Sequence, residues 1–471
     1  MKKVFVSGDF NILHPGHLRL LKFAKESGDY LVVGVHNDKL SNNKGMSQEI
    51  RLESINATSY VDESFILNEE ASEYIQKNKP DIVVKGKEHE DKENPELEII
   101  NAYGGKLIFS SGEIGFTSLE LLREDFLSSP QHLKHSLNYQ KRHNFNLKEL
   151  QSIVAKFSEL KILVIGDTIV DEYITCEPLG MSQEDPTIVV SPLFTDKFIG
   201  GAAIVASHAK TLGAEVEFIS VCGDDESAHY VDEGLKSLHI KSTLFTDATR
   251  PTTLKQRFRA NNKTMLRVNH LKQHAISQEL QDKIVHKIQK NAAELDLIVF
   301  SDFSYGILTN DIVNKIIAIG KEHKIEMVAD SQSSSQIGDI AKFKNMTLVT
   351  PTEREIRLAL GDFESGLVVL SEKFTADSHP KYIFTTLGAE GVMIYNTHAN
   401  ELLTDNITAL STNVKDVSGA GDSLLTCSSM ALCVGADIWQ SAYLGSIAAA
   451  IQVSRVGNIP IDKKEILKEL Y

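Results

Sequence analysis

The sequence predicts an α/β protein built from two successive parallel-sheet units, the second of which carries a small β lid. Its 471 residues are enough for two or three domains at roughly 150 residues each. Short apolar runs of strand length alternate with amphipathic stretches, which is typical of a parallel sheet covered by helices. This alternation stops once, in a polar and basic stretch between Ser128 and Asn146, and then starts again.

Composition and charge narrow the possible partners. The hydrophobic and charged fractions, 42% and 24%, are ordinary for a soluble protein, and no stretch approaches the ~20 apolar residues that a membrane span needs. The formal charge of −15 disfavours nonspecific binding to nucleic acid or anionic lipid. The N-terminus lacks a basic and apolar leader, and the four cysteines lack metal-ligand spacing. We therefore expect a cytoplasmic enzyme with no nucleic-acid or membrane partner.

The first unit is expected over residues 1–130, with a linker at 131–147. Its strand-like runs lie at residues 3–7, 30–36, 81–85 and 106–110, and its helical patterns at 17–27, 49–60 and 70–78.

The second unit is expected over residues 148–471. Its strand-like runs lie at residues 161–165, 215–221, 296–301, 325–330, 347–350 and 382–386. Further β-rich pieces intrude between Asp171 and Val268 and predict a small antiparallel flap or lid. These pieces are residues 187–190, 242–245, 252–258 and 263–268.

A first chemical site is predicted within residues 4–35, which read VFVSGDFNILHPGHLRLLKFAKESGDYLVVGV. A strand, a glycine turn and a helix follow one another here, so the helix opening near His17 points free N–H groups and a positive dipole end at an anion. His14 and His17 could donate hydrogen bonds to a phosphate whose charge grows during nucleophilic attack. Two surface or capping histidines are the alternative.

This segment resembles the HxGH nucleotidyltransferase superfamily. The likeness is greatest to the nucleotidyltransferase domain of the bifunctional heptose enzymes of lipopolysaccharide precursor synthesis, with glycerol-3-phosphate cytidylyltransferase as a cousin. The resemblance implies a Rossmann-like domain with His14, His17 and Lys44 as catalytic residues. It also implies a set of nucleotide-binding residues, which are Gly8, Phe10, Arg51, Lys85, Gly86, Thr117 and Ser118.

Some positions leave the role of this unit's charged residues open. Asp9 stands where the family usually has Cys or Thr, and Asn11 stands where it has Asp. Asp9 brings a negative charge near a phosphate site, so either it faces away or the geometry differs. Lys44 and Arg51 could instead be solvated surface cations.

A second chemical site is predicted at residues 416–422, DVSGAGD, which precede an apolar helix. The two glycines permit a tight turn whose N–H groups can face a transferring phosphoryl group at the helix N-terminus. Asp422 could then accept the proton of an attacking hydroxyl. An ordinary helix-capping aspartate after a glycine turn is the alternative.

The second unit resembles the ribokinase/PfkB family of sugar kinases, most closely the heptose 7-phosphate kinase domain of the same bifunctional enzymes. The resemblance rests on ILVIGDTIVDEY, MSQEDPTIVV, IGGAAIVASHAKTLGA, RPTTLKQRF, FSDFSYG and TTLGAEGVMIY, together with GAGD. It implies a ribokinase-like fold, Mg2+ as cofactor and Glu355 as a metal-site residue. The implied substrate-binding residues are Asp171, Gly200, Gly201, Lys255 and Arg257. The implied nucleotide-binding residues are Thr386, Gly388, Gly391, Ser418, Gly419, Ala420 and Gly421.

Several family positions are substituted in this unit. By this resemblance, Ile204, Thr352 and Ser446 each stand where the family usually has Asn, Tyr305 and Gln332 where it has Lys, and Ser331 where it has Pro. Together they remove polar contacts that the family uses for sugar and Mg2+, while Asp422 is kept. An alternative therefore stays open, in which a weakened kinase-like domain serves ligand sensing or dimerisation.

The sequence as a whole predicts a bifunctional sugar-activating enzyme. We expect ATP-dependent phosphorylation of a sugar or sugar phosphate, and transfer of a nucleotide from ATP or CTP to a sugar 1-phosphate. By resemblance, the substrate is heptose-like, the protein is a homodimer, and the order of its domains is the reverse of that in the heptose enzymes. An NAD-dependent oxidoreductase is disfavoured, because no GxGxxG follows either opening strand.

Overall fold

The computed structural model divides into two compact units, Met1–Pro130 and Gln131–Tyr471. The structure describes residues 2–11, 13, 15–40, 46–86, 94–110, 133, 136–260, 263–333, 338–397, 404–411 and 413–471. Within this part of the chain, no helix combines the length and the apolar character needed to cross a bilayer.

The first unit is a five-stranded parallel sheet in the order β3-β2-β1-β4-β5. Its strands are β1 (Lys3–Gly8), β2 (Tyr30–His36), β3 (Glu63–Leu67), β4 (Ile82–Gly86) and β5 (Lys106–Ser110). Its described helices are α1 (Pro15–Glu26), α2 (Gln48–Asn56), α3 (Ala71–Asn78) and α4 (Glu96–Ala102). The strand order reverses between β1 and β4, and such a switch point opens a crevice at the carboxyl ends of the strands.

The central strand β1 shows how the first unit builds a core on both faces of its sheet. Val4 and Val6 are buried in one apolar cluster, whereas Phe5 is buried in another. Successive side chains of a strand point to opposite faces, so this apolar run can serve both cores.

The second unit is built on a nine-stranded sheet in the order β10-β9-β6-β13-β14-β15-β16-β17-β18. The strands from β10 to β16 are parallel, and β17 and β18 add antiparallel pairs at one edge. The strands are β6 (Lys161–Gly166), β9 (Glu215–Cys222), β10 (Lys241–Thr246), β13 (Leu297–Asp302), β14 (Glu326–Ser331), β15 (Leu348–Val349), β16 (Tyr382–Thr386), β17 (Val392–Asn396) and β18 (Thr404–Ile407).

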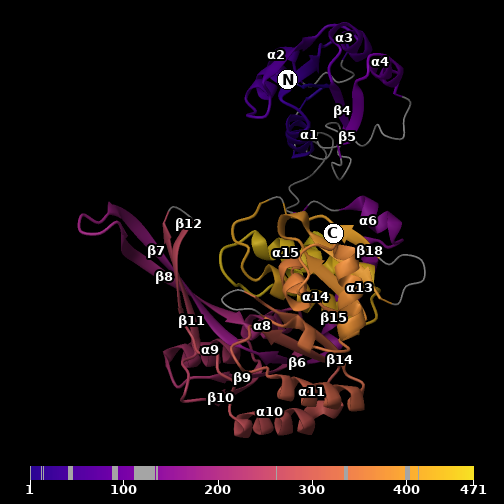
Figure 1. The fold of residues 1–471 in the computed structure, drawn as a ribbon. Helices are drawn as coiled ribbons and strands as arrows, with labels where there is room; N and C mark the ends of the chain where they lie inside the picture. Colours follow the sequence, from indigo (N-terminus) through magenta and orange to yellow (C-terminus); the bar gives the residue numbers. More distant parts are fainter. Residues whose placement is uncertain are drawn as a thin grey trace. The chain divides into compact units, whose positions relative to one another are not determined.

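Helices cover both faces of this sheet (Figure 1). One core includes apolar residues of α8 (Ala202–Thr211), α14 (Ala420–Cys433) and α15 (Ile438–Val453). The other includes apolar residues of α10 (Gln278–Asn291) and α11 (Asn310–His323). The remaining α-helices described in this unit are α6 (Leu137–Arg142), α7 (Leu147–Ala155), α9 (Glu226–Ser237), α12 (Glu353–Leu360), α13 (Leu367–Ser378) and α16 (Lys463–Glu469).

A separate four-stranded sheet, in the order β12-β11-β7-β8, forms the lid, whose long strands project from the body of the unit (Figure 1). Its strands are β7 (Thr168–Met181), β8 (Ile188–Gly201), β11 (Thr253–Ala260) and β12 (Lys263–His270). The expected lid is confirmed, but two details of the prediction are wrong. Residues 242–245 belong to β10 of the main sheet, and β11 pairs with β7 in parallel.

The structure corrects the expectation of a linker at residues 131–147, because the described part of this segment docks onto the second unit. Tyr139 of α6 is fully buried, and its hydroxyl donates to the backbone oxygen of Trp439 over 3.2 Å. Gln140 donates to the hydroxyl of Tyr443 over 2.9 Å, and Phe145 is buried in the same core. The sequence hides this docking because isolated aromatic residues in a polar stretch show no apolar periodicity.

The last helix of the second unit packs against α7, which lies near the start of this unit. Helix α7 contacts α16, and Gln151 donates to the backbone oxygen of Leu470 over 2.7 Å. Lys463 also donates to the backbone oxygen of Ala155 over 3.1 Å. The C-terminal end of this unit therefore lies beside α7, near the unit's start.

Candidate functional site

The candidate site of the second unit is centred on the N-terminus of α14. Gly419 precedes this helix in the left-handed conformation, with φ of 77°. A Cβ on Gly419 would lie 2.6 Å from Oδ1 of Asn458, so a side chain has no room. Ala420, Gly421 and Asp422 form the first turn, whose backbone N–H groups have no partner inside the helix. These N–H groups make the turn suited to an anion.

Asp422 lies buried in this turn and is the candidate base. Its Oδ1 accepts a hydrogen bond from Nε2 of Gln332 over 3.2 Å. Burial and the negative charge of Asp171 raise the pKa of Asp422 to about 7, against the opposing effect of Lys255. A carboxyl group with a pKa near neutrality is matched to accepting a proton at physiological pH.

Two further carboxyl groups lie near Asp422. Asp330, at the end of β14, has a pKa well above its usual range, because it is buried and faces the charges of Glu355 and Asp422. Glu355 accepts hydrogen bonds from the backbone N–H groups of Ser333 over 2.7 Å and Thr352 over 2.8 Å. The site therefore accumulates negative charge that a cation would relieve.

This donor set fits Mg2+ only together with a ligand. Carboxylate oxygens suit Mg2+, which commonly binds one or two carboxylates and completes its shell with water and substrate phosphates. In the described part of the chain, no three acidic, histidine or cysteine side chains form a metal site by themselves. Asp330 and Glu355 are thus suited to hold Mg2+ that arrives with a nucleotide.

The lid brings Asp171 of β7 to the same site. Arg257 of β11 forms an ion pair with Oδ1 of Asp171, and Nδ2 of Asn458 donates to Oδ2 over 3.0 Å. Gly200 is required here, because a Cβ would lie 2.4 Å from Oδ2 of Asp171. Gly201 follows as the N-cap residue of α8.

Lys255 lies beside Asp171 in the lid and is held by two aromatic rings. The two residues are direct partners in the pairing of β11 with β7. Nζ of Lys255 lies 5.0 Å from the ring centroid of Phe303 and 5.4 Å from that of Tyr305. Such cation–π contacts fix the position of the ammonium group. Tyr305, which replaces a lysine of the family, thus holds a lysine from another element.

The other substituted positions also have defined contacts. Ile204 is a buried residue of α8, and the hydroxyl of Ser446 donates to the backbone oxygen of Ala442 over 2.8 Å. Ser331 donates to Oδ2 of Asp302 over 2.7 Å. Thr352 accepts from the N–H of Glu355 as the N-cap of α12, in a capping box with that residue. Each of these four side chains is therefore either buried or held by a hydrogen bond.

The glycines predicted at the ATP side lie after β16. Thr386 ends this strand and forms a bridge with Thr352, which places it next to the Glu355 capping box. Gly388 begins a short 3-10 helix, and Gly391 follows that helix before β17. The structure therefore connects Thr386 with Glu355, whereas Gly388 and Gly391 lie in the turn beyond it.

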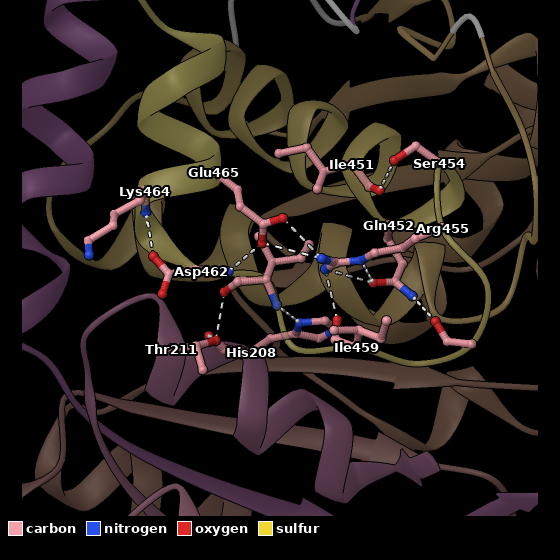
Figure 2. A network of polar contacts seen from close by, with 12 residues as sticks. His208, Thr211, Ile451, Gln452, Ser454, Arg455, Ile459, Asp462, Lys464 and Glu465 are labelled. Atoms are coloured by element: carbon pink, nitrogen blue, oxygen red, sulfur yellow. Dashed lines mark hydrogen bonds and ion pairs between the residues drawn. The ribbon is translucent and has the colours of Figure 1, made fainter. Parts of the chain in front are cut away.

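Sequence reasoning missed the residues that support the loop before α14. Nε2 of Gln452 donates to the backbone oxygens of Ser418 over 3.2 Å and Gly457 over 2.9 Å. Its Oε1 accepts from Arg455, which forms an ion pair with Glu465 (Figure 2). The contact of Gln452 with Ser418 spans 34 positions, and no local motif marks it.

In the first unit, the described part of the HxGH region lies at the end of β1. Gly8 ends the strand, and the ring of Phe10 is buried in the core. His17 lies in the first turn of α1, with its ring centroid 5.2 Å from that of Phe10. The rings of Phe10 and His17 are therefore in contact. The predicted residues His14, Lys44, Thr117 and Ser118 lie outside the described residues.

The structure revises the expectations for Asp9 and Arg51. Arg51 is fully buried and donates to the backbone oxygen of Asp9 over 2.7 Å and to Oδ1 of Asp38 over 2.7 Å. It also donates to the backbone oxygen of Met46 over 3.2 Å. Arg51 is thus neither a surface cation nor an open phosphate ligand, because its guanidinium group joins the loop after β1 to the connection between β2 and α2. Asp9 in turn pairs with His36 over 2.9 Å.

Lys85 and Gly86 lie at the end of β4, next to β1. Nζ of Lys85 pairs with Oε2 of Glu96 over 2.8 Å and donates to Oδ1 of Asn94 over 3.1 Å. Gly86 pairs with Ser110 of β5. Both residues lie at the carboxyl edge of the sheet, and Lys85 is held by an acidic partner.

Comparison with protein families gives one match for each unit. Residues 159–464 match the pfkB family of carbohydrate kinases, and residues 5–105 match the cytidylyltransferase-like family. The two matched regions lie within different units of the fold.

Curated relatives carry the name bifunctional protein HldE. The protein of Geotalea uraniireducens is 29% identical over 327 residues, which cover 69% of this chain and 65% of the relative. That of Helicobacter hepaticus is 31% identical over 317 residues, which cover 66% of this chain and 64% of the relative. The chain thus spans slightly less than two thirds of the length of these relatives.

Solved structures of sugar kinases share the fold of the second unit. Ribokinase from Giardia lamblia matches with a TM-score of 0.53 and 19% identity, over 66% of this chain and 98% of that chain. Arabidopsis thaliana ribokinase complexed with ribose and ATP matches with a TM-score of 0.52 and 16% identity, over 66% and 98% of the two chains. Because the pfkB match covers more than half of the sequence, the chain belongs to the pfkB family of carbohydrate kinases and carries a cytidylyltransferase-like domain ahead of its kinase domain.

Proposed function

We propose that the chain is a bifunctional sugar-activating enzyme. Its second unit transfers a phosphoryl group from ATP to a sugar or sugar phosphate. Its first unit joins a sugar 1-phosphate to a nucleotide and releases pyrophosphate. The observation that carries the kinase proposal is the buried Asp422, which lies in the first turn of α14 and faces Asp171 and Lys255 from the lid.

In the proposed kinase reaction, Asp422 accepts the proton of the attacking sugar hydroxyl. Asp171 and Asn458, joined by a hydrogen bond of 3.0 Å, orient the sugar beneath the lid. The N–H groups of Gly419, Ala420 and Gly421 face the phosphoryl group, which needs positioning and charge stabilisation more than covalent help. Ser418 belongs to the same loop, and Gln452 holds its backbone oxygen.

Mg2+ is the proposed cofactor of this reaction. Asp330 and Glu355 would hold it, because their carboxyl groups lie close enough for Glu355 to raise the pKa of Asp330. When bound with ATP, Mg2+ neutralises part of the phosphate charge.

In the proposed transferase reaction, an oxygen of the sugar phosphate attacks the α-phosphorus of the nucleotide. His14, His17 and Lys44 stabilise the developing charge, and no protein nucleophile is needed. The position of His17 at the start of α1, directly after β1, supports this proposal, because the positive helix end and the sheet switch point coincide there. In this reaction Arg51 does not bind the nucleotide directly; it holds in place the loops that it joins.

A heptose phosphate is the proposed substrate by resemblance, with ATP or CTP for the transferase half. We further propose a homodimer formed through the lid, which is supported by apolar side chains of β7 and β8 that are more than half exposed. These are Leu179, Met181, Ile188, Leu193 and Phe194. The four free cysteines support a proposal that the protein works in a reducing cytoplasm.

A split assay tests the proposed function. The purified protein is incubated with Mg2+, a panel of sugars and sugar phosphates, and ATP or CTP, while ADP and pyrophosphate are measured separately. Sugar-dependent ADP formation supports the kinase, and pyrophosphate release that depends on sugar 1-phosphate supports the transferase. Pyrophosphate release without ADP formation by any sugar in the panel would reject the kinase half.

A further inference from the structure

One hydrogen bond ties the lid to the loop that opens α14. The hydroxyl of Tyr173, on lid strand β7, lies 2.8 Å from Oδ2 of Asp416 and 3.1 Å from Oγ of Ser418. The Tyr173 side chain is buried, and this burial raises its pKa to about 12, so the hydroxyl keeps its proton. It is therefore available as a donor to the carboxylate of Asp416.

Asp416 is the junction of two loops. Its Oδ1 accepts from the backbone N–H of Ser418 over 3.1 Å, in the loop before α14. Its Oδ2 accepts from the backbone N–H of Gly457 over 3.1 Å, in the loop after α15. Burial opposes the charge of Asp416, but the hydrogen bonds from Tyr173 and these N–H groups lower its pKa. A charged acceptor of this kind makes strong hydrogen bonds.

A second hydrogen-bonded connection also joins the lid to these loops. Asp171 lies two positions before Tyr173 on β7, so both side chains are on one face of the lid. Asp171 accepts from Nδ2 of Asn458, which follows Gly457 directly. Oδ1 of Asn458 lies where a side chain on Gly419 would have to be. The proposed sugar ligand and the proposed phosphate turn thus contact the same pair of loops.

The ring of Tyr173 is fixed within the lid. The guanidinium groups of Arg257 and Arg259 lie 5.0 Å and 5.1 Å from its centroid, and the ring of Phe198 lies 5.2 Å away, edge-on. These contacts come from β11 and β8, so the two strands that flank β7 hold the ring. A movement of the lid must therefore move the Tyr173 hydroxyl relative to Asp416.

We propose that Tyr173 couples the two substrate sites of the kinase unit. A sugar bound at Asp171 restrains strand β7. The hydrogen bond from Tyr173 to Asp416 then restrains the turn that receives the ATP phosphates. Coupling of this kind is reciprocal, so bound ATP also strengthens sugar binding. The inference rests on the proposed kinase function, and it makes Tyr173 a positioning residue that need touch neither substrate.

The structural half of this inference is tested without any ligand. Hydrogen–deuterium exchange is measured on the full chain for the wild type and for Tyr173→Phe. We expect faster exchange in peptides that cover residues 416–422 and 455–459. Tyr230→Phe is the matched control, because its hydroxyl donates to the backbone oxygen of Lys197 in the lid and not to the α14 loop. Unchanged exchange in Tyr173→Phe, or an equal rise in Tyr230→Phe, would overturn the inference.

The functional half is tested by the KM for ATP, from ADP release at low and at saturating heptose 7-phosphate. In the wild type the KM should fall as the sugar rises, by about fivefold or more. In Tyr173→Phe this dependence should vanish, whereas Tyr230→Phe should keep it. A double variant with Asp416→Asn should show no further loss, because the two changes break one connection.

The outcomes separate the inference from the function on which it rests. A KM for ATP that is independent of sugar in the wild type overturns the coupling even if ADP forms. Absence of ADP formation with heptose 7-phosphate and with every sugar of the panel rejects the kinase function, and the coupling of substrates falls with it. The exchange result then reports only on the link between lid and loop.

Discussion

Gln332 donates a hydrogen bond from Nε2 to Oδ1 of the buried Asp422 over 3.2 Å. Gln332 stands where the sugar kinases that the sequence resembles have a lysine, so the proposed base has a neutral partner in place of a cation. Burial and Asp171 raise the pKa of Asp422 to about 7. Its protonation state should therefore change within the physiological pH range.

The first prediction concerns the role of Asp422. Asp422→Asn keeps the shape of the side chain but removes the base, so ADP formation should fall by about 10²- to 10⁴-fold. Pyrophosphate release from a nucleotide and a supplied sugar 1-phosphate should stay at the wild-type rate. Wild-type ADP formation in this variant would reject Asp422 as the base.

The second prediction concerns pH. A base acts when deprotonated, so kcat/KM for ADP formation should rise with pH and reach half its maximum near the pKa of about 7. Gln332→Lys places a cation beside the carboxylate and should move this midpoint to lower pH. Gln278→Lys, on the exposed side of α10, is the control and should leave the midpoint in place. A profile that does not change between pH 5.5 and 8.5, roughly the range in which such a base titrates, would contradict the assignment.

The third prediction concerns the transferase half. His17→Ala removes a donor aimed at the reacting phosphate, so pyrophosphate release should fall roughly 10²- to 10³-fold. ADP formation should survive. Because His17 also contacts the ring of Phe10, a thermal melt of the variant must accompany the rates. A lower melting temperature with an unchanged rate would assign His17 to packing alone.

The fourth prediction concerns the close approach of Gly200 to Asp171. A methyl group on Gly200 would lie 2.4 Å from Oδ2 of Asp171, so Gly200→Ala must displace the proposed sugar ligand. We expect kcat/KM for the sugar to fall by up to about a hundredfold, since small misplacements are costly in a preorganised site. Gly366→Ala is the control, because nothing lies within 4 Å of the added atom. Equal kinetics for the two variants would show that Asp171 does not bind the sugar.

The fifth prediction concerns the docked segment before α7. Tyr139→Ala should destabilise the second unit by about 3 to 5 kcal/mol, because it empties a buried site and leaves Tyr443 without its stacked neighbour. Urea unfolding of a fragment of residues 131–471 measures this cost, with the exposed Lys141→Ala as control. A fragment of residues 148–471 should be less stable than the longer one. Equal stability of the two fragments would show that α6 docks without energetic consequence.

The regular parts of the fold could be predicted from local patterns in the sequence. Apolar runs gave the central strands of both sheets, and GAGD before an apolar helix gave the turn that holds Asp422. Strand β3 was not predicted, because Glu63–Leu67 is short and only partly buried. The position of β10 in the main sheet was not predicted either, because a short β-rich piece carries no information about which sheet it joins.

The supporting residues of the kinase site could not be found in this way. Asn458 meets Asp171 across 287 positions, and the pairing of two polar side chains at that separation leaves no periodic trace. Gln452 and Tyr173 likewise act through loops that only the complete fold brings together. Arg51, which was expected to bind phosphate, is buried for the same reason, since its acceptor Asp9 lies 42 positions away in the loop after β1.

The contact between α7 and α16 bears on how such a protein could arise. Gln151 of α7, near the start of the second unit, donates to the backbone oxygen of Leu470, which follows α16. A partner domain fused at either end would therefore leave from neighbouring parts of this unit's surface. A gene rearrangement that moved the transferase from one end of the kinase to the other would therefore change the tether very little. If the heptose enzymes carry the two domains in the opposite order, as the resemblance implies, such an exchange requires no redesign of the kinase fold.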